Sequence, residues 1–96
     1  MKFVNKETEL KITADKAANY VELLLFLYSQ LPTEGISLSK MRTDIKVMDA
    51  LEENVSNSEF EISDNFKESI KEIVAKSSWG IRHKALIEFG DYIESL

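Results

Sequence analysis

Residues 20–31 read YVELLLFLYSQL, the most apolar stretch of the chain. At 3.6 residues per turn, its apolar side chains fall on two sides of one helix. A helix that is apolar on two sides has to be covered from more than one direction. The pattern therefore predicts a central helix that is wrapped by the rest of the chain or shared with a second copy. The first stripe comprises Tyr20, Leu23, Leu24, Leu27 and Leu31, and the second comprises Val21, Leu25 and Tyr28.

The composition indicates one ordered domain that spans residues 1–96. A chain of 96 residues can bury a core of its own but is too short for a second domain. Hydrophobic residues make up 44% of it, and its three glycines and one proline are too few for a disordered chain. It has no cysteine, which excludes disulfides and thiolate sites and suits a reducing compartment. We therefore expect a compact cytoplasmic protein.

Charge and hydrophobicity limit the partners that the chain can have. The formal net charge of -5 at pH 7 argues against general affinity for a nucleic-acid backbone, which requires clustered lysine and arginine. Residues 1–7 lack the apolar run of a signal peptide. Residues 21–31 are too short to cross a membrane and include Glu22. The sequence predicts an acidic, soluble protein without a membrane partner.

The first third of the chain is predicted to form a strand followed by the central helix. Glu9–Ile12 alternates polar and apolar residues, which is typical of a short strand, and Phe3 offers an extension of it. Thr13 is a suitable N-cap for a helix over residues 14–31. Pro32 ends this helix, because proline cannot extend it and disfavours helical geometry at the preceding residue.

A second helix is predicted from about Ser37 to Asn54. Both Ser37 and Ser39 offer an N-cap. The apolar residues of this segment step by three or four positions, so we expect one stripe that faces the core. The stripe comprises Met41, Ile45, Met48, Leu51 and Val55.

A second strand and a third helix follow. Glu59–Ile62 alternates like the first strand, and Ser63 caps a helix that runs to about residue 78. Glu72 and Lys76 are spaced for an ion pair on its solvated side. Trp79-Gly80 is predicted to end the helix, because glycine adopts the left-handed cap at little cost.

A fourth helix is predicted over residues 81–95. Gly90 lies inside it, where glycine costs up to about 1 kcal/mol relative to alanine, so we expect a close approach to another backbone there. Its core stripe comprises Ala85, Leu86, Phe89, Tyr92, Ile93 and Leu96.

The two halves of the chain resemble each other. Residues 9–13 read ELKIT and residues 59–63 read EFEIS, and each half continues as cap, helix, turn and helix. If this β-α-α pseudo-repeat is real, the two strands can pair across a pseudo-twofold axis. Chance similarity of two amphipathic halves is the alternative. The predicted fold is mainly α within the α+β class, with about four helices around the central apolar helix and one or two short strands.

The sequence contains no pattern for catalysis, a metal or a cofactor. His83 is the only histidine and cysteine is absent, so paired imidazoles and thiolates are excluded. The acidic residues between Asp49 and Asp64 lack the spacing of a calcium loop, and their Ser- and Asn-rich surroundings offer no apolar pocket for a general acid. No glycine-rich phosphate loop is present. We expect a protein that is not an enzyme and binds no cofactor or metal.

One basic cluster supports an alternative function. Lys40, Arg42 and Lys46 lie on the predicted second helix, and a short turn before such a helix is typical of a helix-turn-helix DNA reader. However, Asp44 and Asp49 share the helix, and few side chains suit the reading of base edges. A DNA-associated transcriptional regulator is therefore the alternative, and nucleic acid is the less favoured partner.

Three segments carry a resemblance to a known group of proteins. They are Leu38-Ser39-Lys40-Met41-Arg42, Val47-Met48-Asp49-Ala50-Leu51-Glu52, and Trp79 with His83. In this layout the chain resembles small helical proteins of unassigned function that phages and prophages encode. The resemblance implies a small accessory or inhibitor protein rather than an enzyme, and it supplies no active-site residues. A protein-interaction or assembly module is the function that we predict.

Surplus apolar side chains on two predicted helices indicate where a partner docks. Exposed apolar surface on a soluble protein usually marks an interface. The simplest partner is a second copy, since twofold dimers are the commonest oligomers. The alternative is a monomer whose own core covers both surfaces. The candidate residues are His83, Ile87 and Gly90 on the fourth helix and Val21, Leu25 and Tyr28 on the central helix.

Overall fold

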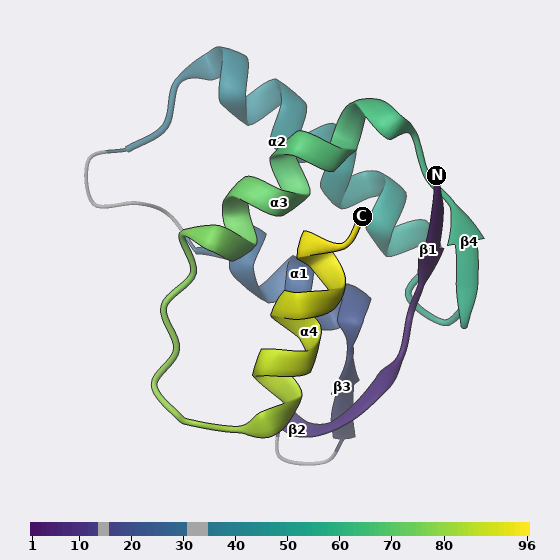
Figure 1. Ribbon diagram of the computed structural model, residues 1–96. Helices are drawn as coiled ribbons and strands as arrows, with labels where there is room; N and C mark the ends of the chain where they lie inside the picture. The colour runs from purple at the N-terminus through teal and green to yellow at the C-terminus, as the bar shows by residue number, and fades with distance from the viewer. Residues whose placement is uncertain (14–15, 31–34) are drawn as a thin grey trace.

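The computed structural model describes residues 1–13, 16–30 and 35–96. Four α-helices and four short antiparallel strands occur in these residues, so the chain has the predicted α+β class (Figure 1). In chain order the elements are β1 (Lys2–Val4), β2 (Glu7–Thr13), β3 (Lys16–Asn19), α1 (Tyr20–Ser29), α2 (Leu38–Glu53), β4 (Glu59–Glu61), a 3-10 turn (Asp64–Phe66), α3 (Lys67–Ala75) and α4 (Lys84–Glu94).

The strands form two separate antiparallel pairs. β1 pairs with β4, where Phe3 lies opposite Phe60, and β2 pairs with β3, where Lys11 lies opposite Ala17. The predicted strands at 9–12 and 59–62 are present, but they do not form the pair that a real pseudo-repeat would allow. Each takes a different partner. The partner of β2 follows closely in sequence, so its pairing closes a shorter loop and loses less chain entropy.

The start of α1 differs from the prediction, because residues 16–19 form β3 and the helix begins at Tyr20. Asn19, not Thr13, is the N-cap. Its side-chain oxygen accepts from the Glu22 N–H at 2.9 Å, and the Glu22 carboxylate accepts from the Asn19 N–H at 3.2 Å. This reciprocal capping box satisfies two N–H groups at the start of the helix. The predicted stop at Pro32 lies outside the described residues.

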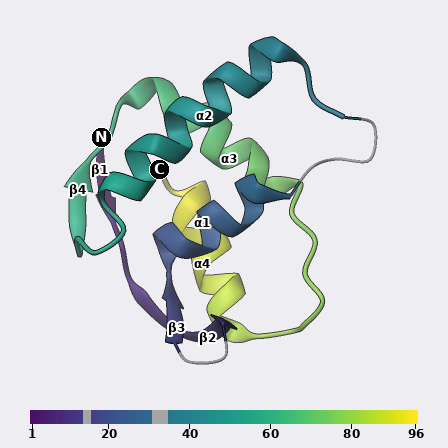
Figure 2. The ribbon, with the colours of Figure 1, turned by 180° about the vertical axis from the view of Figure 1, so that it is seen from behind.

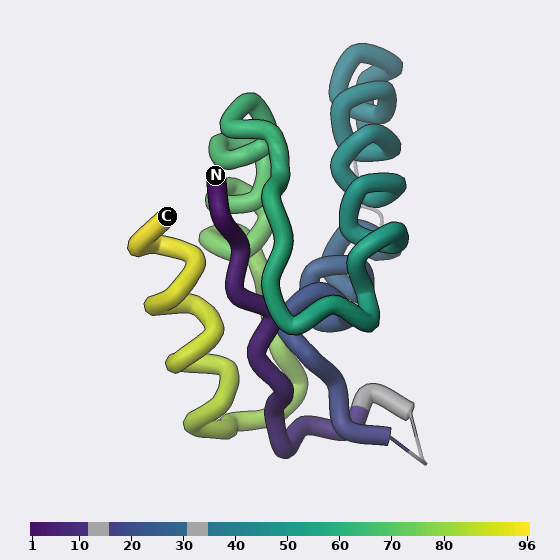
Figure 3. The backbone as a smooth tube through the Cα atoms, turned by 90° about the vertical axis from the view of Figure 1, so that its right-hand side faces the viewer, coloured from purple at the N-terminus to yellow at the C-terminus, as the bar shows by residue number. Residues whose placement is uncertain are grey.

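Among the described residues, α1 supplies more of the buried apolar side chains than any other element. This helix contributes six buried residues and contacts α2, α3 and β3. α2 and α4 lie on opposite sides of the molecule in Figure 3, and Figure 2 shows α1 in front of α4 and below α2. The buried apolar residues are Phe3, Leu10, Ala18, Tyr20, Val21, Leu23, Leu24, Leu27, Tyr28, Val47, Leu51, Ile62, Ile70, Phe89 and Ile93.

A buried polar side chain joins three parts of the fold. Asn5, between β1 and β2, is only 5% exposed. Its side-chain oxygen accepts from the Val21 N–H at 2.9 Å, and its amide donates to the carbonyls of Val55 at 3.2 Å and Asn57 at 2.9 Å. Asn19 also donates to the Val55 carbonyl, at 2.8 Å. We call Asn5 and these partners the Asn5 hub. It ties the first turn of α1 to the loop after α2.

α2 has the predicted bounds, with Ser37 as N-cap and Asn54 as C-cap. The predicted core stripe is correct only in the second half of the helix. Leu51 is fully buried, whereas Met41 is 38% and Ile45 50% exposed. The reason is that the first turns of α2 extend beyond the other helices, as Figure 3 shows. A stripe of apolar residues is buried only as far as its neighbours reach.

The connection between α3 and α4 is longer than predicted. α3 ends at Ala75 with Lys76 as C-cap, and α4 begins at Lys84. Gly80 therefore caps no helix, and it does not have a positive φ angle. The predicted close approach at Gly90 is also wrong, because a Cβ atom added there would meet nothing within 4 Å. Residues 76–83 form an extended loop that passes the end of α1.

The predicted ion pair on α3 is confirmed. The Lys76 ammonium donates to the Glu72 carboxylate at 2.8 Å. Lys40 of α2 lies 3.5 Å from the same carboxylate. The hydrogen bond from Lys76, with the positive charge of Lys40, lowers the pKa of Glu72.

Candidate functional site

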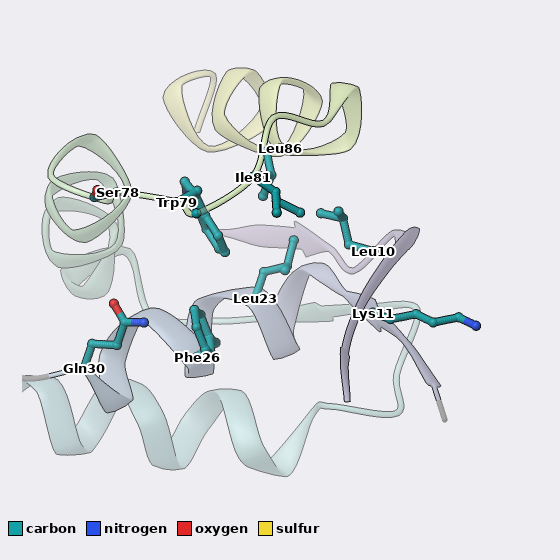
Figure 4. Close-up of a pocket in the computed structure, with 10 residues that line it drawn as sticks. Leu10, Lys11, Leu23, Phe26, Gln30, Ser78, Trp79, Ile81 and Leu86 are labelled. Atoms are coloured by element: carbon teal, nitrogen blue, oxygen red, sulfur yellow. The ribbon is translucent and has the colours of Figure 1, made fainter. Parts of the chain in front are cut away.

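An apolar pocket opens between α1, β2 and the loop that precedes α4 (Figure 4). It has a volume of about 160 Å³ and is partly open to solvent. Its lining residues are Leu10 and Lys11 of β2, Leu23, Phe26 and Gln30 of α1 and its C-cap, Ser78, Trp79, Gly80 and Ile81 of the loop, and Leu86 of α4. We call this the Trp79 pocket. Elements that are distant in sequence therefore meet at one site.

The walls of the Trp79 pocket combine buried and exposed side chains. Leu23 is fully buried and forms part of the base, where Leu10 points toward it. Phe26 is 37% and Ile81 59% exposed. Leu23 and Phe26 are three residues apart, so their side chains lie on the same side of α1. Phe26 is about one turn nearer the C-terminal end of the helix, where fewer neighbours cover it. The mouth of the pocket is therefore an exposed apolar surface.

Trp79 is held in place by contacts on two sides. Its ring stacks on that of Phe26, with centroids 5.8 Å apart and an interplanar angle of 22°. Its indole N–H donates to the Ser77 hydroxyl at 3.1 Å, and that hydroxyl donates to the Val74 carbonyl at 2.6 Å. The indole is thus fastened both to α1 and to the end of α3. The geometry gives the pocket a fixed aromatic wall.

The Trp79 pocket carries one charge. Lys11 is the single ionisable residue among those that line it, and Figure 4 shows the Lys11 side chain running outward from the apolar base. No acidic side chain lines the pocket in the described part of the chain. This contrasts with the net charge of -5 for the whole chain. The apolar walls of the pocket are therefore formed by uncharged side chains, and the Lys11 ammonium lies away from them.

A second, wider cleft is lined in part by Arg82 and His83, the last residues of the same loop. It has a volume of about 820 Å³, and residues of β2 and of the start of α4 line much of it. Charges of both signs line it, and Lys6 lies 3.7 Å from Glu88. Burial, and then the charge of Glu88, raise the pKa of Tyr20 in its wall. Such a broad cleft with paired charges has the character of a solvated surface.

His83 has a structural role at the edge of this wider cleft. It is the N-cap of α4, and its Nδ1 atom accepts from the Ala85 N–H at 3.0 Å. The imidazole therefore satisfies one of the free N–H groups at the start of the helix. Across residues 1–13, 16–30 and 35–96, no group of three or more His, Cys, Asp or Glu side chains is arranged to hold a metal ion.

The predicted interface residues are found in different environments. Val21 and Tyr28 are buried inside the chain, so the prediction that they form an exposed surface is wrong, because the second stripe of α1 packs within the fold. Leu25 is half-buried against the core. On α4, Ile87 is 67% exposed, while His83 and Gly90 are half-buried. Of the two predicted interface stripes, only the one on α4 includes a largely exposed apolar side chain, that of Ile87.

The predicted basic residues are all exposed on α2. They are Lys40, Arg42 and Lys46. Lys40 is engaged by Glu72 of α3, as described above. The half-buried Asp44 lies on the same helix. The structure thus places these residues on one element but gives them no shared site.

Sequence reasoning missed the Trp79 pocket. The sequence predicts that Trp79-Gly80 ends a helix, and Phe26 is one of many apolar residues in α1. The available signal was the single tryptophan between serines and a glycine, a setting in which a large ring packs against another element. Its partner cannot be identified from the spacing of residues.

Comparison of the chain with protein-family models, with curated proteins and with solved structures gives no match. None of the helices in the described ranges has the length and apolar character needed to span a bilayer.

Proposed function

We propose that the chain is a small protein-interaction module that docks a partner at the Trp79 pocket. The observation that carries the proposal is the combination of a hollow apolar base with the exposed rings and side chains of Phe26 and Ile81 at its mouth. Exposed apolar surface around a concave site is typical of binding surfaces. The free energy of docking would come from covering this surface.

The lining of the pocket supports binding rather than catalysis. A general acid and base require two positioned ionisable groups, and Lys11 alone is available among the lining residues. Ser78 has no basic side chain beside it in the lining. The accessory or inhibitor role that the phage resemblance implies agrees with a binding module, and it remains a prediction. Cytoplasmic location and self-association also remain predictions.

Photo-crosslinking tests the proposal. A photoreactive phenylalanine analogue is placed at Ile81, at Ile45 of α2 or at Ile87 of α4, all three of which are exposed. In the native host, we expect Ile81 alone to give a covalent adduct with another protein. Equal adducts at Ile81 and Ile45 would contradict a specific pocket. An adduct confined to Ile87 would move the docking surface to α4, and an adduct of two copies would support the dimer.

The DNA-associated regulator is the less supported function. Lys40 is paired with Glu72, Asp44 shares the helix, and the net charge of -5 opposes approach to a phosphate backbone. A gel-shift measurement with duplex DNA at low salt provides the test, because binding through phosphates weakens steeply as salt rises. Retardation that Arg42→Ala and Lys46→Ala abolish would favour the regulator over the interaction module.

A further inference from the structure

We infer that α2 pairs with α2 of a second copy of the chain, with the two helices antiparallel and their exposed sides in contact. We call the side of α2 that carries Leu38, Ile45 and Asp49 the outer α2 face. This surface is separate from the proposed function, because no residue of α2 lines the Trp79 pocket. It also differs from the dimer surfaces on the central and fourth helices that the sequence predicts.

The first half of the outer α2 face is apolar. Leu38 is 67%, Met41 38% and Ile45 50% exposed. Steps of three and four residues place these side chains on one side of the helix. Val47 and Leu51 are buried on another side of α2, against the core. Because α2 lies at the edge of the molecule in Figure 3, the apolar stripe is accessible to another molecule.

The charges beside this stripe change sign along the helix. The basic residues Arg42 and Lys46 lie in its first half, and both are exposed. The acidic residues Asp49 and Glu53 lie in its second half and are exposed as well. No ion pair engages any of the four within the described ranges. Each like-charged couple is four residues apart, a spacing at which like charges destabilise a helix. The chain therefore leaves both couples without a compensating charge.

The helix dipole increases this difference between the two ends of α2. A helix carries a partial positive charge at its N-terminus and a partial negative charge at its C-terminus. α2 has no acidic residue in its first turn and no basic residue in its last turn. Glu72 of α3 compensates Lys40, which leaves Arg42 as a free cation near the positive end. A complementary surface has to be acidic beside Arg42 and basic beside Asp49, and the outer α2 face of an antiparallel second copy has this pattern.

Full overlap of the two helices determines which residues meet. α2 spans Leu38–Glu53, so the twofold axis of a fully overlapping antiparallel pair passes between Ile45 and Lys46. Arg42 then lies opposite Asp49 of the second copy, and Asp49 lies opposite the second Arg42. A twofold contact makes each such pair twice. The apolar Ile45 lies next to its own copy at the axis.

The size of the face limits the strength of the dimer. A helix of 16 residues is about 24 Å long and about 10 Å wide. One side of it covers less than the roughly 800 Å² that each partner buries in a standard interface. We therefore expect a reversible dimer with a Kd between about 10 μM and about 1 mM.

Charge reversal tests the pairing of Arg42 with Asp49. Sedimentation equilibrium up to about 1 mM chain measures the Kd of the natural protein, of Arg42→Glu, of Asp49→Arg and of the double variant. Each single variant places like charges opposite each other twice, so we expect about tenfold weaker association. The double variant exchanges both charges, keeps the net charge and should restore the natural Kd. Arg82→Glu changes an exposed arginine before α4 and is the matched control, with no expected effect.

Three results would overturn the inference. They are a natural chain that stays monomeric at every concentration, a double variant as weak as the single variants, and an equal weakening by Arg82→Glu. All three positions are exposed, so the variants should fold, which circular dichroism verifies.

Introduced cysteines test the direction of the two helices, because the chain has no cysteine of its own. In oxidised glutathione, Ile45→Cys should form a disulfide between two copies, since Ile45 lies at the axis. Leu38→Cys should not crosslink with itself but should crosslink with Glu53→Cys when the two variants are mixed. Crosslinking of Leu38→Cys with itself would show a parallel pair and overturn the inference. Crosslinking confined to Ile87→Cys would place the dimer contact on α4 instead.

Discussion

The Asn5 hub and the Trp79 pocket differ in which side chains are buried. A polar side chain is buried at the hub, and apolar side chains are exposed at the pocket. At the hub, a polar side chain is buried and its amide and carbonyl oxygen all have hydrogen-bond partners. At the pocket, large apolar side chains remain partly in contact with water. Burying a polar group is costly unless it is hydrogen-bonded. The polar groups of the hub therefore need their partners within the fold, and the hub stabilises the folded state. The exposed apolar surface of the pocket makes no such internal contacts, so a partner can cover it without disrupting the fold.

The two regions differ in whether they have groups left to bind a ligand. A satisfied buried polar group joins segments that are distant in sequence and leaves no group free for a ligand. An apolar hollow at the surface gains free energy only when something covers it. The two regions should therefore respond to substitution in opposite ways, with stability lost at the hub and binding lost at the pocket.

Within the two regions compared, the largest loss of stability is expected for Asn5→Ala. The change leaves the buried Val21 N–H and the Asn57 carbonyl without their side-chain partners. At about 1 to 3 kcal/mol for the buried N–H and less for the carbonyl of the exposed Asn57, we expect the free energy of unfolding to fall by about 2 to 3 kcal/mol. Urea denaturation measures it. The matched control is Asn57→Ala, whose exposed side chain should cost less than about 1 kcal/mol. Equal losses in the two variants would remove the distinction between hub and surface.

A second buried polar group, the Tyr28 phenol, should make the free energy of unfolding depend on pH above pH 10. Tyr28 bonds the Ser69 hydroxyl at 2.7 Å, and burial raises the pKa of Tyr28 to about 12 while that hydrogen bond opposes the increase. The unfolded chain then loses the phenol proton near pH 10, before the folded chain does. Stability is fully present below pH 10 and falls by about 2 to 3 kcal/mol as the pH rises to about 12.

The measurement compares unfolding of the natural chain and of Tyr28→Phe at pH 9 and in strong alkali. Tyr28→Phe should lose less stability over this interval, since it retains Tyr20 and Tyr92 but not the buried phenol. The same alkaline loss in both proteins would mean that Tyr28 is not the group responsible.

Phe26→Ala tests the wall of the pocket, with a smaller effect. Phe26 is partly exposed and its main specific contact is the stack with Trp79. We expect a loss of about 1 kcal/mol in stability and a shift of Trp79 emission to longer wavelength as the indole becomes hydrated. Leu24→Ala on the same helix is the control, and as a fully buried residue it should cost about 2 to 5 kcal/mol. A larger cost at Phe26 than at Leu24 would place the pocket wall inside the core.

The smallest effect on stability is expected for Ile81→Ser at the mouth of the pocket. The side chain is 59% exposed, so the free energy of unfolding should change by no more than about 0.5 kcal/mol. Docking of a partner at the Trp79 pocket should nevertheless weaken, because the mouth loses apolar area. Thermal unfolding is measured on this variant, and docking is measured by photo-crosslinking from Gln30, an exposed residue that also lines the pocket. A loss of stability without a loss of binding would invert the roles assigned to the two regions.

Local patterns in the sequence were sufficient for elements that depend on neighbours in the chain. The bounds of α2 follow from Ser37 and Asn54, and the Glu72–Lys76 pair follows from helical spacing. Two of the short strands were also correctly located from alternation alone. A cap, an i to i+4 pair and a strand period are each formed within a few residues, so their signals are present in the sequence itself.

Only the tertiary structure decided which groups meet across the chain. Thr13 and Asn19 are both acceptable N-caps, and pairing of residues 16–19 with β2 selects the second. Met41 and Leu51 belong to one stripe, yet only Leu51 lies where other elements cover it. The hub and the pocket are both formed by segments distant in sequence, and periodicity carries no information on such contacts. Burial depends on what lies opposite a side chain, and only the folded chain determines that.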